Sequence, residues 1–255
     1  MDFADKKGAA VVTGGTGGIG ATIVDMFLER GSAVSFTYHR NTAAADAKVA
    51  EQTAAERRVS AARVDLTDEE RVAAYFHRVV EEFGAIHTLV YASGPHVPMV
   101  HLSKVSPAQY ARQLNDDALA FFTLAVTALP HLRETQGNIV AVTTAATRRF
   151  PVRDGLSSAP KGAVEATVRG IAAEEGRFGI RANTVGPGML TDGMADRLIG
   201  TGELSDEALA ITQRNIPLRR FGRAADIAEA VCFLASDRAN FISGQHLDVD
   251  GGYGV

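Results

Sequence analysis

The chain has 255 residues, of which 46% are apolar and 22% are charged, with a formal net charge of −4. This is the composition of a globular protein with a large core, and a mildly acidic balance without a Lys/Arg cluster argues against a nucleic-acid partner. A single cysteine, Cys232, excludes disulfides and thiolate metal sites, and no stretch approaches the length of an apolar membrane span.

No Pro-rich, Ser-rich or highly charged linker divides the sequence, so we expect one domain over residues 1–255. The first residues contain no apolar signal-peptide core. We therefore expect a cytoplasmic protein.

The first strand-like run, Ala9–Val12, leads directly into Thr-Gly-Gly-Thr-Gly-Gly-Ile-Gly at residues 13–20. Glycine allows a sharp turn and lets phosphates approach the backbone, because no Cβ obstructs them. The helical pattern that follows would aim its free N–H groups and positive dipole end at the same place. The run fits both G-x-G-x-x-G and T-G-x-x-x-G-x-G, and it predicts a dinucleotide-binding loop.

Short apolar runs alternate with longer helical patterns along the rest of the chain. The predicted strands are Ala9–Val12, Ala33–Tyr38, Ala61–Val64, Thr88–Tyr91, Asn138–Val142, Ala182–Val185 and Gln245–Val249. The predicted helices lie near residues 18–30, 42–57, 68–83, 107–134, 157–178 and 224–235. This order predicts an α/β fold, a doubly wound parallel sheet of Rossmann type with about seven strands and helices on both faces.

Ligands of such a fold bind beyond the carboxyl ends of the strands. Polar or glycine positions follow five of the predicted strands: Gly14, Asp65, Gly94, Thr144 and Pro187-Gly188. We expect all five to lie at one edge of the sheet.

With these residues in view, nearly the whole chain resembles the short-chain dehydrogenase/reductase family, including its 3-oxoacyl-ACP reductases. The matching segments are Thr13–Gly20, Val64-Asp65-Leu66, Tyr91-Ala92-Ser93-Gly94 in place of N-N-A-G, Asn115, Lys161, Pro187-Gly188 with Thr191, and Gly244–Gly252. The resemblance implies a nicotinamide dinucleotide as cofactor. It implies cofactor contacts from Gly14, Thr16, Gly18, Ile19, Gly20, Tyr38, His39, Arg40, Asp65, Leu66, Ala92, Ser93, Gly94, Lys161, Pro187, Gly188 and Thr191.

The end of the second strand favours NADP(H) over NAD(H). An NAD site usually carries an acid there to bind the ribose hydroxyls, but this stretch reads Tyr38-His39-Arg40. A carboxylate would repel a 2′-phosphate, whereas an arginine fork can bind it. Arg40 could instead be a solvated charge at a helix start, and Asp65 either meets the adenine, as the resemblance implies, or serves as a charge at the start of the next helix.

The resemblance assigns four catalytic positions, to Asn115, Thr144, Ser157 and Lys161. Thr144 replaces a serine and keeps a hydroxyl donor. Ser157 stands where the family has its general-acid tyrosine. A phenol begins near pKa 10 and an adjacent ammonium can bring it toward working pH, but an aliphatic hydroxyl cannot ionise usefully. Losing a positioned acid typically costs about 10²–10⁴-fold in rate.

Three interpretations of the missing tyrosine remain open. In the first, the protein is a reductase with a substitute acid, either His96 in the loop after the fourth strand or Asp154, seven residues before Lys161. In the second, it reduces an activated C=C bond, because the family's 2,4-dienoyl-CoA reductases also carry Ser-x-x-x-Lys and a Thr-Thr pair like Thr143-Thr144, although their tyrosine position is Ala146 here. In the third, it binds dinucleotide without redox chemistry, as a sensor or partner subunit.

The resemblance also implies a substrate lid over about residues 189–215, and small-molecule or acyl-thioester substrates. It implies a homotetramer or dimer built on the helices near 107–134 and 157–178. The seven histidines show no metal-ligand spacing. We therefore expect no metal site.

Overall fold

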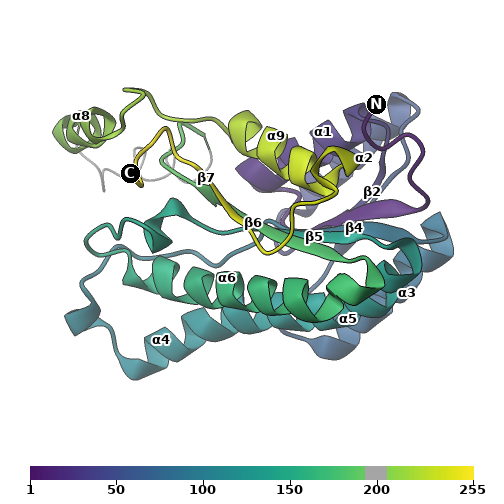
Figure 1. Cartoon of the computed structure of the whole chain (residues 1–255), viewed down its shortest axis with the longest axis horizontal. Helices are drawn as coiled ribbons and strands as arrows, with labels where there is room; N and C mark the ends of the chain where they lie inside the picture. The colour runs from purple at the N-terminus through teal and green to yellow at the C-terminus, as the bar shows by residue number, and fades with distance from the viewer. Residues whose placement is uncertain (193–205) are drawn as a thin grey trace.

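A computed structural model describes residues 1–192 and 206–255. A parallel seven-stranded sheet runs through it, in the order β3-β2-β1-β4-β5-β6-β7 (Figure 1). The strands are β1 Ala9–Val12, β2 Ala33–Tyr38, β3 Val59–Arg63, β4 Ile86–Tyr91, β5 Asn138–Val142, β6 Arg181–Pro187 and β7 His246–Val249. The order reverses between β1 and β4, and in sheets of this kind ligands bind beyond the carboxyl ends of the strands at such a reversal.

Helices cover both faces of the sheet. Figure 1 shows α1, α2 and α9 on one face, α3, α5 and α6 on the other, and α8 at the left end of the view. The described α-helices are α1 Gly18–Glu29, α2 Thr42–Ala54, α3 Glu69–Phe83, α4 Pro107–Gln113, α5 Ala120–Thr135, α6 Gly155–Glu175, α8 Asp206–Asn215 and α9 Ala224–Ala235. The predicted doubly wound α/β class is confirmed.

The core divides into two apolar layers because the central strands are buried on both faces. Alternate residues of β1 enter different layers: Val11 packs with the α3, α5 and α6 side, and Val12 with the α1 and α9 side. Cys232 of α9 is fully buried in the second layer. Burial raises the pKa of its thiol to about 12, so Cys232 packs as a small, unreactive core residue.

The predicted bounds agree with the structure where the sequence pattern is strongest. The strands Ala9–Val12, Ala33–Tyr38 and Asn138–Val142 and the helix over 224–235 have the predicted ends. The helix predicted over 107–134 is interrupted, because residues Leu114–Leu119 form a π-helical segment between α4 and α5. A capping box at Ser106 and Pro107 in the first turn fix the start of α4.

The expected lid over residues 189–215 includes α8, which the sequence pattern did not predict. Its residues 193–205 lie outside the described part of the chain. Within the described part, no helix combines the length and the apolarity needed to cross a membrane.

Candidate active site

The glycine-rich loop forms a tight turn whose shape depends on missing side chains. Gly14 has φ +70°, and a Cβ there would lie 2.7 Å from the Ala92 carbonyl oxygen. A Cβ on Gly15 would lie 2.5 Å from the Phe36 ring, and one on Gly20 would overlap the Gly14 carbonyl oxygen. The fold therefore leaves no room for a side chain at positions 14, 15 and 20. Gly15 belongs to the predicted G-x-G-x-x-G pattern, Gly14 to T-G-x-x-x-G-x-G, and Gly20 to both.

The start of α1 fits an anionic ligand. Its N-cap is Gly17, which has no side chain to accept from the first-turn N–H groups, and its first turn contains no acid. Gly18, Ile19 and Gly20 therefore offer backbone donors at the positive end of the helix dipole. A glycine cradle beneath an uncapped helix start is the arrangement that holds a pyrophosphate.

Hydrogen bonds fasten this loop to the neighbouring strands. The Gly15 N–H donates to the Thr37 carbonyl at 2.9 Å, the Thr13 N–H to the Val90 carbonyl at 2.9 Å, and the Ala92 N–H to the Thr13 hydroxyl at 3.1 Å. The predicted cofactor residues after β1 and β4 thus form one connected surface at the strand-order reversal.

Beyond β2 and β3 the sheet edge is basic. His39 and Arg40 are exposed directly after β2, and Arg63 pairs in register with Tyr38 at the end of β3. The Arg63 Nε donates to the His39 carbonyl at 3.0 Å, which holds this guanidinium beside the end of β2. Arg63 had no part in the sequence-based expectations.

Asp65 and Leu66 follow β3 on the same edge. The Asp65 carboxylate accepts from the Thr67 hydroxyl at 2.7 Å and from the Thr67 N–H at 3.0 Å, and these hydrogen bonds lower its pKa. Asp65 stays exposed, so its carboxylate is accessible to a ligand. Leu66 packs against the core layer of α3, α5 and α6.

Lys161 lies at the centre of the other half of the site. Its ammonium donates to the Asp117 carboxylate at 2.8 Å and to the Ser93 carbonyl at 3.2 Å, and it lies 4.9 Å from the centre of the Tyr91 ring. The Tyr91 hydroxyl donates to the same carboxylate oxygen at 2.8 Å. Burial raises the pKa of the Tyr91 phenol well above its usual value, so Tyr91 is a neutral donor.

The remaining predicted catalytic residues do not form a hydrogen-bonded chain with Lys161. Asn115 is exposed and donates to Asp116 at 3.2 Å. Thr144 follows β5, and its hydroxyl accepts from the Ala146 N–H at 3.2 Å. Ser157 lies in the first turn of α6, one helical turn before Lys161 and on the same face.

The two candidate stand-in acids differ in burial. His96 is exposed, and its carbonyl accepts from the Gln113 side chain at 3.0 Å. Asp154 precedes α6 and is half-buried; its carboxylate accepts from the Ser158 hydroxyl at 2.8 Å. Burial raises the pKa of Asp154 and the hydrogen bond partly opposes this rise. A raised pKa favours the protonated form that a proton donor needs.

The segment after β6, residues 188–192, completes the row of predicted cofactor residues at the carboxyl ends of the strands. A Cβ on Gly188, after Pro187, would lie 2.6 Å from the Asp250 Cα. The Thr191 N–H donates to the Gly222 carbonyl at 2.9 Å, and Asp192 accepts from the Ala224 N–H at 2.9 Å, capping α9. These contacts hold Thr191 beside the start of α9.

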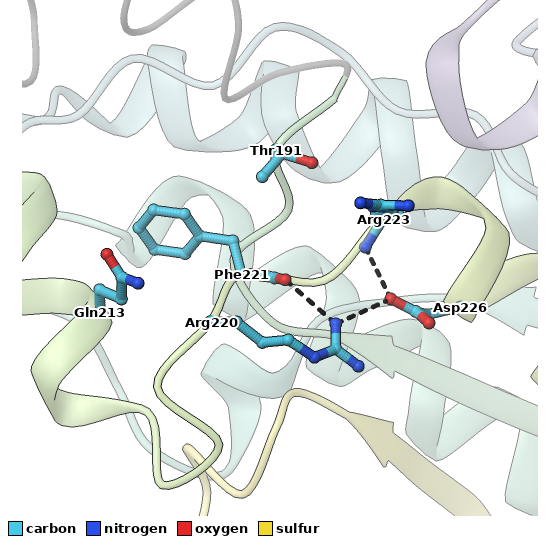
Figure 2. Close-up of a pocket in the computed structure, with 6 residues that line it drawn as sticks. All are labelled: Thr191, Gln213, Arg220, Phe221, Arg223 and Asp226. Carbon is cyan, nitrogen blue, oxygen red and sulfur yellow. Dashed lines mark hydrogen bonds and ion pairs between the residues drawn. The ribbon is translucent and has the colours of Figure 1, made fainter.

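A cavity of about 480 Å³ adjoins this segment (Figure 2). Its lining consists of Thr191, Gln213, Arg220, Phe221, Arg223 and Asp226. In Figure 2 the Arg220 guanidinium turns toward Asp226, whose carboxylate also accepts from the Arg223 N–H at 2.8 Å. Asp117, Ser157 and Lys161 do not line this cavity, so it lies apart from the candidate catalytic residues.

Asp117 and Tyr91 are the residues that the sequence reasoning missed beside Lys161. A signal for Asp117 exists: it stands on the buried stripe of its helix, four residues before Phe121 and seven before Leu124. Asn115 does not stand on this stripe. A charged residue on an apolar stripe needs a buried partner, and Lys161 is that partner. Within residues 1–192 and 206–255, no group of His, Cys, Asp and Glu side chains could hold a metal ion.

Comparison with known proteins gives one family. The family model described as Enoyl-(Acyl carrier protein) reductase matches residues 14–254. Among curated relatives, cis-4-hydroxycyclohexanecarboxylate dehydrogenase of Sinomonas cyclohexanicum is 34% identical over 98% of this chain and 97% of its own length. L-fucose dehydrogenase of Mus musculus is 34% identical over 95% of this chain and 86% of its own length.

Solved structures agree in fold. A short-chain dehydrogenase from Burkholderia cenocepacia, in complex with NADP, has a TM-score of 0.88 at 30% identity. The match covers 99% of this chain and 100% of the Burkholderia chain. A blue fluorescent protein from a metagenomic library, in complex with NADPH, has a TM-score of 0.89 at 29% identity with 100% of both chains covered. The chain therefore belongs to the short-chain dehydrogenase/reductase family of oxidoreductases.

Proposed function

We propose that this protein is an NADP(H)-dependent oxidoreductase that reduces a carbonyl or an activated C=C bond of a small-molecule or acyl-thioester substrate. The observation that carries the proposal is the glycine cradle at Gly14, Gly15 and Gly20 beneath the uncapped start of α1. This cradle fits a pyrophosphate. When bound, the nicotinamide supplies the hydride.

Two arginines support NADP(H) over NAD(H). Arg40 and Arg63 lie at adjacent strand ends, and the contact of Arg63 with the His39 carbonyl leaves the rest of its guanidinium for a ligand. A 2′-phosphate between them would gain charge-assisted hydrogen bonds. The relatives solved with NADP and NADPH are consistent with this preference.

The names of the relatives and of the family model support two broad classes of substrate. Two of them are dehydrogenases of small hydroxylated compounds, L-fucose and cis-4-hydroxycyclohexanecarboxylate, and the matching family model is described by an acyl-thioester reductase. Thr144 would donate a hydrogen bond to the reacting oxygen, with the proton supplied by Asp154, His96 or a solvent molecule held at Ser157.

An oligomer is part of the proposal. Four apolar side chains of this region are exposed: Tyr110 in α4, Leu119 in the π-helical segment, and Phe122 and Val126 in α5. Leu119, Phe122 and Val126 lie at helical spacing on one face, and exposed apolar side chains that gather on one face favour a protein–protein contact. We propose that this face pairs with a second copy, in a dimer or homotetramer.

A second candidate is a dinucleotide-binding protein without redox activity. It is favoured by Ser157, whose hydroxyl cannot replace a phenolic acid, and by Lys161, whose charge is already neutralised by Asp117.

One experiment separates the two functions. NADPH and NADH binding is measured by nicotinamide fluorescence, and NADPH oxidation is then followed across ketones, enones and enoyl thioesters, with the reverse reaction on sugars and cyclic alcohols. Binding with turnover supports the oxidoreductase. Binding without turnover on the whole panel supports the second candidate, and absence of binding of either dinucleotide overturns both.

A further inference from the structure

We propose that Glu165 is a positioning residue for Thr144: through the Thr147 hydroxyl it holds the short turn that aims the Thr144 hydroxyl at the reacting oxygen. The inference rests on the proposed function, in which Thr144 donates a hydrogen bond to that oxygen. It extends that function to a buried carboxylate outside the expected set of site residues.

The Thr144 hydroxyl is oriented by the turn that follows it. Thr144 is the N-cap of a 3-10 turn over Ala145–Thr147, and its hydroxyl oxygen accepts from the Ala146 N–H at 3.2 Å. A hydroxyl has one proton to donate. Because the Ala146 N–H occupies one side of the oxygen, this proton points away from the turn. The donor direction of Thr144 therefore depends on the shape of residues 144–147.

Glu165 holds the other end of this turn. The Thr147 hydroxyl oxygen lies 2.9 Å from the Glu165 Oε1 and 3.1 Å from the Thr144 carbonyl oxygen. One hydroxyl proton is thus available to two acceptors, and an ionised carboxylate is a stronger acceptor than a carbonyl. The carboxylate therefore fixes the Thr147 side chain, and with it the last residue of the turn.

Glu165 is itself held by side chains of the last two strands. It is 8% exposed on α6, and within the described part of the chain no lysine or arginine forms an ion pair with it. The His246 Nδ1 lies 3.5 Å from the Glu165 Oε1 and 2.8 Å from the Thr184 hydroxyl, and the His246 Nε2 lies 2.7 Å from the Asp248 carboxylate. These contacts confine the imidazole, and the imidazole confines the carboxylate.

The backbone of β6 leaves room for this cluster. Gly186 pairs in register with Asp248 of β7. A Cβ on Gly186 would lie 2.7 Å from the His246 ring and 2.8 Å from the Asp248 carboxylate, so both side chains lie over the glycine. Asp248 also pairs with Arg148, at 3.1 Å. The turn is thus held at two adjacent residues, Thr147 by α6 and Arg148 by β7.

The burial of Glu165 favours a directing role over a packing role. A buried carboxylate lowers stability unless its oxygens are fully partnered, and an apolar residue of similar size avoids that cost. Glu165 lies one helical turn after Lys161 on α6. One helix therefore carries both the lysine of the site and the carboxylate that fixes the turn after β5.

The first test removes one hydroxyl and keeps the branched side chain. We expect Thr147→Val to lower kcat for NADPH-dependent reduction about tenfold, the size of one lost hydrogen bond to a charged group, with KM and NADPH affinity changed less than about twofold. Thr147→Ser keeps the hydroxyl and should restore kcat to within about twofold of the wild type. Urea denaturation checks that each variant is folded.

The second test removes the acceptor. Glu165→Leu should lower kcat as Thr147→Val does, and the Thr147→Val/Glu165→Leu double variant should lose no more than either single variant. Both single variants should also speed amide hydrogen exchange over residues 145–149 about tenfold, because the turn that protects the Ala146 N–H is loosened. Mass spectrometry measures this exchange without any substrate.

Thr135→Val is the matched control, because the half-buried Thr135 hydroxyl donates to the Ile86 carbonyl at 2.8 Å, at the opposite end of the parallel strands. It should leave kcat and the exchange of residues 145–149 unchanged. Wild-type kcat or wild-type exchange in Thr147→Val, a Thr147→Ser variant as slow as Thr147→Val, or additive losses in the double variant would overturn the inference.

Failure of the proposed function gives a different result. A wild-type protein that reduces nothing on the substrate panel overturns the proposed function, and with it the catalytic role of Thr144. The hydrogen exchange of residues 145–149 then still shows whether Glu165 holds the turn: faster exchange in Glu165→Leu supports that contact, and unchanged exchange overturns it.

Discussion

The two halves of the sheet edge depend on different parts of the chain. Around β1, β2 and β3 the site is made of backbone: the glycine turn, the free N–H groups of α1 and two strand ends. Around β4, β5 and β6 it is made of side chains: Asp117, Thr144, Ser157 and Lys161. The glycine turn that the sequence predicts lies in the backbone half, and the departure that it predicts at Ser157 lies in the side-chain half.

The comparison teaches where substitution is tolerated. Replacing Gly14 or Gly20 would collide with fixed carbonyl groups of the fold itself, so these positions are constrained by folding as well as by the ligand. Ser157, where the family resemblance implies a tyrosine, is a half-buried site in the first turn of a helix, so we expect a change there to affect catalysis more than the fold. We therefore expect that binding and catalysis can change separately in this fold.

The largest expected effect comes from filling the cradle. Gly20→Val places a side chain against the Gly14 carbonyl, so we expect loss of NADPH binding by about 100-fold or more and destabilisation of about 2 kcal/mol or more. Binding is followed by fluorescence titration and stability by urea denaturation. Gly162→Ala is the control, since a Cβ there meets nothing within 4 Å; wild-type binding by Gly20→Val would mean that the cradle does not hold the ligand.

The next effect is on catalysis and not on binding. Ser157→Tyr restores a phenol one helical turn before Lys161, and we expect carbonyl reduction to rise about tenfold or more with NADPH affinity little changed. Steady-state kinetics on the ketone panel measure this. Ser157→Phe supplies the ring without the hydroxyl, and an equal gain from it would show that the phenol's acidity is not the cause.

A smaller effect should separate the two dinucleotides. Arg40→Ala and Arg63→Ala are each expected to weaken NADPH binding about tenfold, because each removes a charge-assisted contact to a 2′-phosphate, and to leave NADH binding unchanged. Arg57→Ala is a suitable comparison: its guanidinium hydrogen-bonds Gln52 at 2.7 Å just before β3. Equal losses for NADH and NADPH would contradict a phosphate site.

The smallest effect concerns Asp154. Burial raises its pKa, so a donor role predicts that reduction is fastest at acid pH and falls as pH rises through this raised value and the carboxyl ionises. Asp154→Asn should flatten that part of the pH–rate profile and lower the rate about threefold or more at its acid end. His96→Ala tests the exposed alternative; profiles like that of the wild type for both variants would dismiss both residues as donors.

Local pattern was enough for the parts of the fold that have regular periodicity. Three strands and α9 have their predicted ends, because buried parallel strands are continuous apolar runs and an amphipathic helix repeats its buried face. Residues 107–134 also show helical periodicity, but the pattern did not reveal the π-helical break at Leu114–Leu119. The π-helical segment packs against α6, which lies far along the sequence.

The sequence by itself determined the parallel α/β fold and the glycine turn, and it predicts the departure at Ser157, because each of these follows from residue types at short spacing. Only the tertiary structure decided that Asp117 pairs with Lys161 and Tyr91 and that Arg63 stands beside the end of β2. These contacts join residues that are 26 to 44 positions apart for the Asp117 cluster and 24 for Arg63. Strand order and helix packing bring residues so far apart in the sequence together. A local sequence pattern does not contain that information.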